Sequence, residues 1–546
     1  MKKTLFFFFH FISFYSISYA QNTYDLVYQI LNSSTCGSAN SSCHNSSAPS
    51  GLNFSLSSAA VYNQLYMQVP SNTIALTKNN KLVYPGDPYR SFLFRKINNG
   101  LAYNVDLSNE GSNMPLSAPA LNDKQIELVR QWIIYGAQET GNVIDTALIS
   151  SFYDDQGIES VPNPPLPPVN SEGFQIHLGP ILLPPFGENV FLFSGGEFSR
   201  FDYPGNSTTA LYKMTSYAGE GHHHFTLFSN TNTNLTYGLQ YANAQFQDSK
   251  FLMSSQQIID TLEFPSGTGV FTGVNEPLIV NVHYFNPYPK TMACDFYVNL
   301  YTKSTDEVVQ EMKFSDNGYP DNPNNPPFYI LPDGLEHTFE YDAYNPGSSE
   351  TRYVWAVMGH SHARTVKNIV YLRNTNGTKG EKIYEAGCYE GIPGCISPYF
   401  DAVHVPTRYL DNYLPLNLSS GLIQEASYIN NGPDTIFYGP WANESEMMVF
   451  GYYYVSDTTA LGIIENHQNT LSVYPNPFSG NFYIECSEKM KSVELFDLSA
   501  KSTLKKEFGK PERKISMDCL HLISGVYILK IITEEDNSYF KRIICR

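Results

Sequence analysis

The stretch Gly221-His222-His223-His224-Phe225-Thr226-Leu227-Phe228 runs three consecutive histidines directly into an apolar strand. Three more short motifs place histidine or methionine beside strand-forming residues: Val-Asn-Val-His-Tyr (280–284), Gly-His-Ser-His-Ala (359–363) and Ser-Glu-Met-Met-Val (445–449). Imidazole nitrogens suit copper, and a thioether is a soft ligand that favours Cu(I). Together the motifs predict a redox pair of copper sites built on β strands, with these candidate ligands: His223, His224, His283, His360, His362 and Met447.

Strand geometry allows these residues to meet. Residues i and i+2 of a strand point to the same face, so His360 and His362 can reach one metal ion, with Met447 alongside as a softer ligand. His283, in a strand that looks buried, can join the histidines at 222–224. Each motif alone has an ordinary explanation: a surface histidine cluster, a hydrogen-bonded core histidine, or methionine packing. Only their joint occurrence in this order favours metal binding.

The composition limits the class of protein. The chain has 546 residues and a net charge of −18, which argues against binding nucleic acid or an anionic membrane. Charged residues make up only 16%, whereas there are 40 tyrosines, 35 phenylalanines, 34 prolines and 37 glycines. Aromatic and turn-forming residues at these levels indicate sandwiches of short strands rather than helical bundles. We therefore expect a multidomain, mainly β protein.

Residues 1–20 have the pattern of a secretion signal. Lys2 and Lys3 provide the positive start, an apolar run follows over 5–15, and Ser18-Tyr19-Ala20 offers small residues for cleavage. The apolar run is too short to span a membrane, and no later stretch approaches the length of about 18 apolar residues that a span needs. We expect a mature chain that begins at Gln21 and has no transmembrane segment.

The N-terminal part of the mature chain, 21–145, reads as a small, mostly helical domain. Its clearest helix runs from Asp123 to Tyr135, where Asn122 can cap the start, Gln125 can close the capping box and Gly136 can end the helix.

The remaining domains follow from changes in composition. A proline-rich linker covers 146–172, and alternating strands with turn residues then continue to 457. We divide this β region into domains 173–303 and 304–457. A second linker, 458–470, leads to another strand-patterned domain, 471–546, which is richer in Lys and Glu.

Eight cysteines in an exported chain are able to form disulfides. Cys36 lies near Cys43, and Cys388 lies near Cys395, so these are candidate pairs. Three more share the C-terminus (Cys486, Cys519 and Cys545), and Cys294 has no obvious partner.

On the histidine and methionine motifs, the region 173–457 resembles the copper type II, ascorbate-dependent monooxygenases, the family of peptidylglycine α-hydroxylating monooxygenase and dopamine β-monooxygenase. The matching motifs are His223-His224-Phe-Thr-Leu-Phe228, His283-Tyr284, His360-Ser-His362, and Glu446-Met447 before the tyrosines at 452–454. The resemblance implies two β-sandwich, jelly-roll-like domains that carry one copper each, with a solvent cleft between them.

The resemblance also implies a role for each residue. His223, His224 and His283 would hold a copper that stores and delivers an electron. The catalytic set, His360, His362 and Met447, would hold the copper where O2 and the substrate bind. One register choice stays open, because strand geometry would pair His222 with His224, whereas adjacent ligands His223 and His224 need a local bulge.

Four positions depart from the family pattern. The cysteine that usually follows the methionine ligand is Met448 here, and its usual partner position is Ser427, so both ends of one disulfide are replaced together. Two groups that hold the peptide carboxylate in the peptide-specific enzyme, an arginine and a tyrosine, are Met358 and Gly451 here. These changes leave copper chemistry in place and favour a neutral or aromatic substrate over a peptidylglycine.

Near the N-terminus, Cys36 is separated by six residues from Cys43-His44, which looks like a stretched haem c attachment site, whose usual spacer is two residues. With Pro85-Gly86-Asp87-Pro88, Met114-Pro115 and the helix that ends near 137, this order resembles the cytochrome c domains fused to secreted bacterial enzymes. The resemblance implies haem c with axial ligands His44 and Met114. A Cys36–Cys43 disulfide in a haemless relic of that fold fits the spacing as well, and both interpretations stay open.

The C-terminal segment begins Val473-Tyr474-Pro475-Asn476-Pro477-Phe478 and carries Gly525-Val526-Tyr527 near its end. It resembles the sorting domain of type IX secretion, which implies an immunoglobulin-like β-sandwich and handling by the type IX machinery. The resemblance further implies a Gram-negative bacterium, passage through the periplasm, cleavage near 458–470, and a secreted or outer-surface product. The alternative is an accessory immunoglobulin-like domain of the same fold.

Together these features predict a secreted copper-dependent monooxygenase. It would hydroxylate an activated C–H bond of a small-molecule or peptide-like organic substrate, using O2 and either a reductant such as ascorbate or electrons from the haem. Two other classes stay open: a surface copper-binding or electron-transfer protein without catalysis, and a β-sandwich adhesin with unrelated histidines.

Overall fold

The computed structural model of the chain divides into two compact units, Met1–Thr458 and Thr459–Arg546. It describes every residue except these: 1–21, 34–35, 38–42, 47–50, 103–104, 117, 162, 195–208, 231–237, 242–248, 274–275, 322–324, 387–404, 406, 460–470, 475–480, 497–500, 519–521, 524, 535–537 and 546. The predictions for the secretion signal, the 458–470 linker, the Cys388–Cys395 pair, Cys519 and most of the 473–478 motif therefore fall largely outside the described residues.

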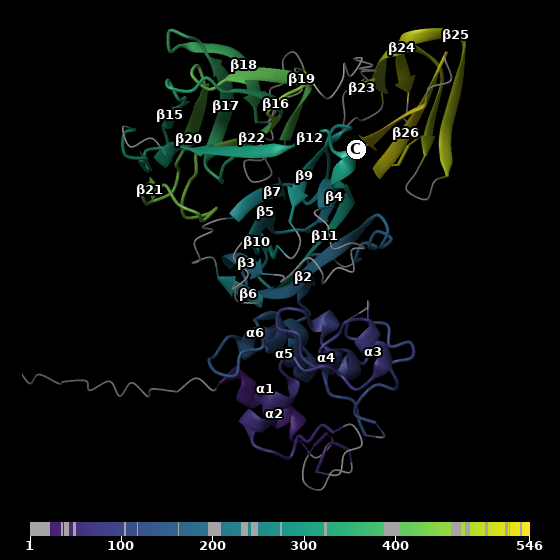
Figure 1. Cartoon of the computed structure of the whole chain (residues 1–546). Helices are drawn as coiled ribbons and strands as arrows, with labels where there is room; N and C mark the ends of the chain where they lie inside the picture. The colour runs from purple at the N-terminus through teal and green to yellow at the C-terminus, as the bar shows by residue number, and fades with distance from the viewer. Residues whose placement is uncertain are drawn as a thin grey trace, which may run out of the picture. The chain divides into compact units, whose positions relative to one another are not determined.

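The first unit begins with a helical module, residues 22–154 (Figure 1). Its helices are α1 (Thr23–Leu31), α2 (Ser58–Leu65), α3 (Thr73–Thr77), α4 (Phe92–Ile97), α5 (Asp123–Ile134) and α6 (Thr146–Asp154). The predicted helix is α5, and both halves of its capping box, Asn122 and Gln125, are present. The module packs around Trp132, whose buried ring lies 5.2 Å from the ring of Tyr24.

The predicted linker 146–172 is partly wrong. Residues Thr146–Asp154 form α6, because Asp145 caps the helix by accepting a hydrogen bond from the Ala147 amide and Ile149 packs into the module core. Ile158–Glu159 then forms strand β1, which pairs with β11 (Met292–Ser304). Only the proline-rich part after 160 connects the module to the next domain without helix or strand.

The first β domain consists of two sheets. One contains β1, β2 (Gly173–Leu183), β4 (Thr209–Tyr217), β8 (Ile259–Glu263), β9 (Thr268–Thr272), β11 and β12 (Gln310–Glu311). The other has the strand order β6 (Gly238–Tyr241), β3 (Glu188–Ser194), β10 (Leu278–Phe285), β5 (His222–Asn230) and β7 (Ser249–Ser255). The sheets pack face to face, with the rings of Phe225 and Phe296 4.6 Å apart. Because β12 pairs with β9, this domain extends past the predicted boundary at 303.

The second β domain also has two main sheets. The first has the order β13 (Lys313–Gly318), β22 (Val449–Val455), β16 (Thr351–His360) and β19 (Thr407–Asn417). The second has the order β15 (Glu336–Ala343), β20 (Leu422–Ile429), β17 (Thr365–Arg373) and β18 (Lys379–Glu385), and β14 (Tyr329–Ile330) pairs with β21 (Ile436–Phe437). One apolar core, which includes Val354, Phe450 and Tyr428, joins the two sheets.

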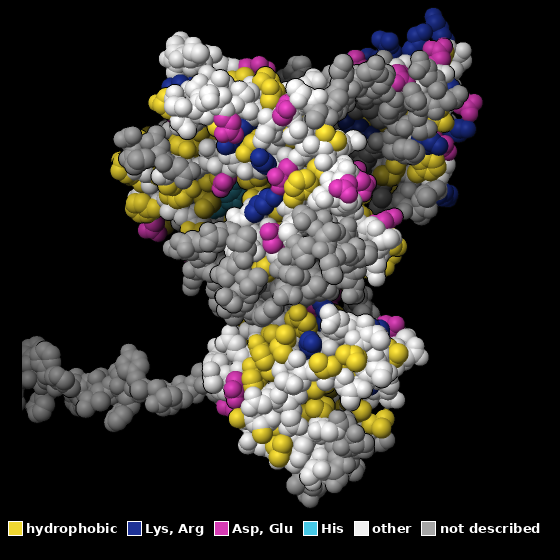
Figure 2. All heavy atoms as spheres, viewed as in Figure 1, with side chains coloured by type: hydrophobic (Ala, Val, Ile, Leu, Met, Phe, Trp, Pro, Cys, Tyr) yellow, Lys and Arg dark blue, Asp and Glu magenta, His cyan; other side chains and the backbone are white. Residues whose placement is uncertain are grey.

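The C-terminal unit is a single five-stranded sheet: β23 (Leu471–Tyr474), β24 (Asn481–Phe496), β25 (Ser502–Asp518), β26 (Gly525–Thr533) and β27 (Ser538–Cys545). The long strand β24 pairs with β23 through its first half and with β26 through its second half, and Ile484 and Val493, from the two halves, share one apolar core. The immunoglobulin-like sandwich stays a prediction. Figure 2 shows Lys and Arg side chains gathered over one end of this unit, which agrees with the higher Lys content of residues 471–546.

Candidate functional site

Strands β5 and β10 settle the geometry of the histidine triplet. His283 pairs with His224, but the next residue, Tyr284, pairs with His222, so His223 is an extra residue in a β-bulge. Such a bulge turns two adjacent side chains toward the same side. The ring of His222 instead packs between the sheets, 5.5 Å from the ring of Tyr284. The structure therefore favours the pair His223 and His224 over the alternative that includes His222.

The structure gathers five of the six predicted ligands into one group, which we call the histidine cluster: His223, His224, His283, His360 and His362. The ring of His223 lies 4.9 Å from that of His283, 4.9 Å from that of His360 and 5.1 Å from that of His362. The ring of His224 lies 5.3 Å from that of His283 and 5.1 Å from that of His360. The two sets of rings thus meet, instead of facing each other across the solvent cleft that the resemblance implies.

Hydrogen bonds decide which ring nitrogens carry lone pairs. The Nδ1 of His362 lies 3.1 Å from the carbonyl oxygen of Ser445, which can only accept, so Nδ1 carries the proton and Nε2 keeps the lone pair. By the same logic the Nε2 of His283, 2.8 Å from a carboxylate oxygen of Glu188, is protonated and Nδ1 keeps the lone pair. Both of these lone-pair nitrogens are buried without a hydrogen-bond partner among the described residues.

A buried nitrogen without a hydrogen-bond partner calls for an explanation, and a bound metal ion is one such explanation. Metal-binding histidines usually donate their second ring N–H to a carboxylate or a carbonyl group, as His283 and His362 do. The donor set therefore fits a metal ion that prefers imidazole, such as copper or zinc.

Burial also favours the neutral imidazole, the form that binds metal, at His224, His360 and His362. The pKa values of His224 and His360 lie well below the usual range, because burial and then the neighbouring imidazoles penalise the charged form. Burial lowers the pKa of His362 to about 4.

Two side chains of the first β domain orient the cluster from across the domain boundary. Gln256 donates from Nε2 to the Gly359 carbonyl (2.7 Å), so its Oε1, 2.7 Å from the Nδ1 of His360, accepts a hydrogen bond from that ring. Glu188 bonds to His283 and accepts from the backbone amides of Ala442 and Asn443 in the second domain. Burial raises the pKa of Glu188, but its hydrogen bonds outweigh burial and lower that pKa overall. The sequence analysis missed both residues.

Glu446, next to Met447, holds the loop that carries His362. Its carboxylate accepts hydrogen bonds from the amides of His362 (3.1 Å) and Arg364 (2.5 Å) and from the Thr365 hydroxyl. Burial raises the pKa of Glu446 to about 7 in spite of these bonds. In the Glu446-Met447 motif, the glutamate therefore holds the loop in place by hydrogen bonds, and the methionine is the candidate ligand.

An apolar pocket of about 330 Å³ lies against the cluster. His224, His360 and Met447 all line it, so the structure brings the predicted methionine beside two of the histidines. Its other lining residues are mostly apolar or aromatic and include the stacked rings of Phe251 and Phe314, 3.7 Å apart. The structure therefore places Met447 at the pocket, and its role as a ligand stays a prediction.

Two of the four positions that depart from the family pattern line the apolar pocket. Met358 and Gly451 both contribute to the wall, and the one charged side chain among the described lining residues is Asp316. A Cβ atom at Gly451 would lie 2.2 Å from a ring carbon of Phe314, so a tyrosine would fit there only if Phe314 moved. The other two departing positions are those of the replaced cysteine pair. Met448 packs in the buried core, and the Ser427 hydroxyl forms a hydrogen bond with the Thr338 hydroxyl (2.8 Å).

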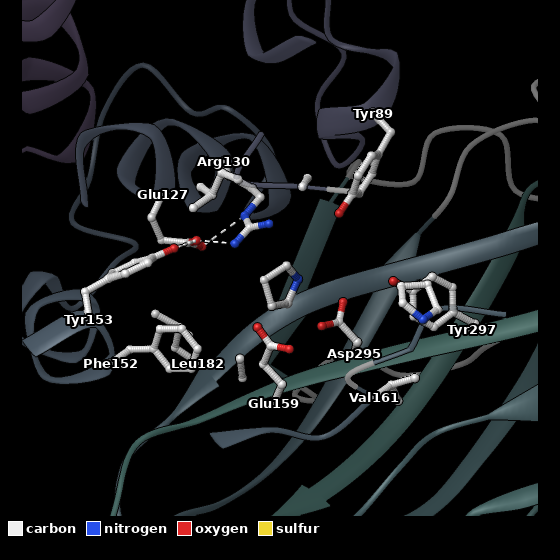
Figure 3. Close-up of a pocket in the computed structure, with 15 residues that line it drawn as sticks. Tyr89, Glu127, Arg130, Phe152, Tyr153, Glu159, Val161, Leu182, Asp295 and Tyr297 are labelled. Atoms are coloured by element: carbon white, nitrogen blue, oxygen red, sulfur yellow. Dashed lines mark hydrogen bonds and ion pairs between the residues drawn. The ribbon is translucent and has the colours of Figure 1, made fainter. Parts of the chain in front are cut away.

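A second cavity, of about 110 Å³, lies between α5 and strands β2 and β11 (Figure 3). Glu127 and Arg130 point into it from α5 as a buried ion pair, and Asp295 points into it from β11. Tyr153 donates to Glu127 (2.8 Å), and Gln131 donates to both Glu127 and the Pro180 carbonyl, 2.7 Å each. Because Glu127 and Arg130 bond to each other and to neighbouring groups, this cavity forms a polar joint between the helical module and the first β domain.

The helical module has its own apolar cavity, and the four predicted haem residues, Cys36, Cys43, His44 and Met114, all line it. The ring of His44 lies 4.8 Å from that of Phe54, and burial lowers the pKa of His44, which favours the neutral imidazole. Two thiols, an imidazole and a thioether at one apolar cavity are the groups that haem c attachment needs. Cys294, on β11, is buried and forms no disulfide.

Acid is expected to destabilise the metal-free protein through His362. Its folded pKa is about 4, whereas an unfolded imidazole titrates near 6.5, so between these values only the unfolded chain gains the proton. The free energy of unfolding should fall as the pH drops through this window, by about 3 kcal/mol in all, with no further change from this group below pH 4.

The measurement is the melting temperature of metal-free wild type and His362→Asn from pH 7 to pH 4. Asparagine keeps a donor that can reach Ser445 but does not titrate, so the variant should lose less stability in acid. Equal losses in the two proteins would contradict the low pKa.

Comparison with known proteins identifies one part of the chain. Residues 472–546 match the family model of the secretion system C-terminal sorting domain. This domain marks proteins exported by type IX secretion, so the chain is a secreted or cell-surface protein. In the described part of the chain, no helix has the length and apolar character needed to cross a membrane. No curated protein matches the sequence.

Solved structures give only distant likenesses. CopC from Methylosinus trichosporium OB3b has 10% identity and a TM-score of 0.12, and the match covers 14% of this chain and 90% of that one. A Ruminococcus gnavus β-glucuronidase has 12% identity and a TM-score of 0.14 over 39% of this chain and 36% of that one. A β-D-glucuronidase from Dictyoglomus thermophilum has 9% identity and a TM-score of 0.16, over 61% and 43%. At these TM-scores the likenesses carry no argument about fold or function.

Proposed function

We propose that this secreted protein is a copper-dependent monooxygenase whose centre is the histidine cluster. One observation carries the proposal: five imidazoles from three separate segments converge beside an apolar pocket that a methionine also lines. A surface cluster would be solvated and charged at acid pH, and a core histidine would have both nitrogens bonded. Convergence of this kind, with buried lone pairs, is what a metal centre requires.

Copper bound here would supply the O2 activation and electron storage that hydroxylation of a C–H bond needs. The roles proposed for the residues follow the family pattern. His223, His224 and His283 would hold the electron-storing ion. His360, His362 and Met447 would hold the ion nearest the substrate, because His360 and Met447 line the pocket.

The surrounding residues do the positioning. Gln256, Glu188 and the Ser445 carbonyl each hold the proton on one ring nitrogen, so the other nitrogen of His360, His283 and His362 faces inward as a donor. The aromatic wall of the pocket, with Phe251 and Phe314, excludes water and favours an apolar substrate.

The second part of the proposal is that the helical module carries haem c, with Cys36 and Cys43 as attachment points and His44 and Met114 as axial ligands. Their convergence on one apolar cavity supports it. The haem would bring electrons to the copper centre, because the helical module packs directly on the first β domain through α5. A diffusible reductant such as ascorbate remains the other source.

A non-catalytic copper protein is the second candidate function. The observation that favours it is the burial of the cluster, since His223, His283 and His362 have no exposed surface. An electron-transfer protein needs little access to its metal, whereas an oxygenase needs a route for O2 and substrate. The apolar pocket beside His224 and His360 provides such a route and therefore favours catalysis.

Copper-loaded protein given ascorbate and ¹⁸O2 is expected to place ¹⁸O in a neutral aromatic substrate but not in a glycine-extended peptide. A carboxylate needs a cationic or hydroxyl anchor, and the pocket wall offers Met358 and Gly451 at the matching positions. Losing such a charge-assisted bond costs about 1.5–3 kcal/mol, or roughly ten- to a hundredfold in affinity. Mass spectrometry of the products decides the outcome.

Peptide turnover at ordinary enzymatic rates would show the substrate inference to be wrong. If the copper-loaded protein hydroxylated no member of a broad panel of aromatic substrates, that result would favour the electron-transfer alternative.

A further inference from the structure

The histidine cluster crosses the boundary between the two β domains. His223, of the first β domain, lies as close to His360 of the second domain as to His283 of its own, at 4.9 Å between ring centres in both cases. The family pattern would divide these residues between two separate ions. The structure does not keep that division, because one of the two shortest ring contacts runs across the domains.

One set of three residues is arranged for a shared ion. One ring nitrogen from each of His223, His360 and His362 lies within 4.8 Å of the other two. A point between three atoms so placed lies no more than about 2.8 Å from each, and imidazole–metal bonds are about 2.0–2.1 Å long, so a small inward movement of the rings completes the site. The Nε2 lone pair of His362 is already buried in the cluster.

Independent contacts hold the two domains together around these rings. Gln256 of the first domain bonds to both His360 and the Gly359 carbonyl of the second. Glu188 of the first domain is fastened to Ala442 and Asn443 of the second, and Asn443 donates a further bond from its side chain (2.9 Å). The close approach of the rings is therefore part of a domain interface in which each polar contact also orients a histidine or the loop before Met447.

We propose that His223, His360 and His362 share one metal ion, so that metal binding fastens the two β domains together. The inference rests on the proposed copper function, and it reassigns His223 from the ion of its own domain to the ion of the other. His224 and His283, whose rings are 5.3 Å apart, are left to hold the second ion. Met447, which lines the same pocket as His360, would be available to the shared ion as a softer ligand.

The first test compares copper content after dialysis at a free copper concentration just sufficient to fill the wild-type protein. His223→Ala and His362→Ala should each lose one copper per chain, and the double variant should lose only the same one. His337→Ala, which removes a partly buried imidazole on β15 that bonds to Asp333 away from the cluster, is the control and should lose none. A double variant that loses two coppers where each single variant loses one would overturn the shared ion and leave the copper function intact.

The second test uses the wild-type protein and does not depend on how the variants fold. Two Cu(II) ions a few ångströms apart couple magnetically, so the fully loaded protein should show the half-field transition of a Cu(II) pair in electron paramagnetic resonance. The spectrum of two isolated Cu(II) ions would overturn the shared site. A wild-type protein that binds no copper would instead remove the proposed function and the inference together.

Discussion

Replacing His360 by alanine is expected to abolish copper-dependent hydroxylation. The ring of His360 contacts those of His223, His224 and His362, at 4.9, 5.1 and 5.2 Å, and it also lines the apolar pocket. Among the described histidines of the cluster, His224 is the only other one that both contacts neighbouring imidazole rings and lines the pocket. Changes in the groups around metal ligands already cost about 10–100-fold in affinity or activity, so loss of the ligand itself should cost more.

Gln256 gives this experiment a graded comparison. Gln256→Leu removes the acceptor for the His360 Nδ1–H and should lower activity by about 10–100-fold, whereas Gln256→Glu keeps an acceptor and should lose less. His337→Ala controls for the loss of an imidazole elsewhere. Activity and copper content would be measured on each variant, and full activity in His360→Ala would remove His360 from the metal centre.

Expression together with a cytochrome c maturation system is expected to yield a red protein whose haem survives denaturation. Cys43→Ser should weaken the covalent attachment, and His44→Ala should remove the proximal ligand and shift the absorption spectrum, since both residues line the same apolar cavity. Haem staining after denaturing electrophoresis measures the first effect, and absorption spectroscopy measures the second.

A colourless protein would contradict the haem proposal. Mass spectrometry that finds a Cys36–Cys43 disulfide in that protein would establish the alternative, a haemless relic of a cytochrome c fold. The copper proposal does not depend on this result, because ascorbate or another reductant can take the place of haem.

Local sequence signals predicted the elements that depend on neighbouring residues. The capping box at Asn122 and Gln125 fixed α5 to within one residue of its end. The alternating and apolar segments predicted the mainly β character, and the motif set at 472–546 predicted the sorting domain that the family model confirms. In each case the information lies within a few residues along the chain.

The missed features depend on contacts between distant residues. Gln256 reaches His360 across 104 positions, and Glu188 reaches Asn443 across 255, so no local pattern marks either residue. The boundary at 303 failed for a similar reason, because β12 joins the first domain only by pairing with β9. A short helix such as α6 was read as part of a linker because its burial depends on the rest of the module.

The candidate site shows both sides of this limit. The motifs singled out the five histidines that the structure brings together and the methionine that lines the adjoining pocket, because these residue types suit metal ions; their role as ligands stays a prediction. The convergence of the five histidines into one cluster depends on how two β domains pack, which the spacing of the motifs does not encode. The bulge at His223 is an intermediate case. The sequence indicated that a bulge is needed if His223 and His224 are both ligands, and the strand pairing of His283 with His224 and of Tyr284 with His222 shows that the bulge is present.

The copper content of the purified mature protein tests the central claim most directly. Protein dialysed against copper and then freed of loosely bound ions would be analysed by inductively coupled plasma mass spectrometry. The histidine cluster predicts close to two tightly bound coppers per chain. A protein that retains no copper would contradict the assignment of the histidine cluster as a copper centre.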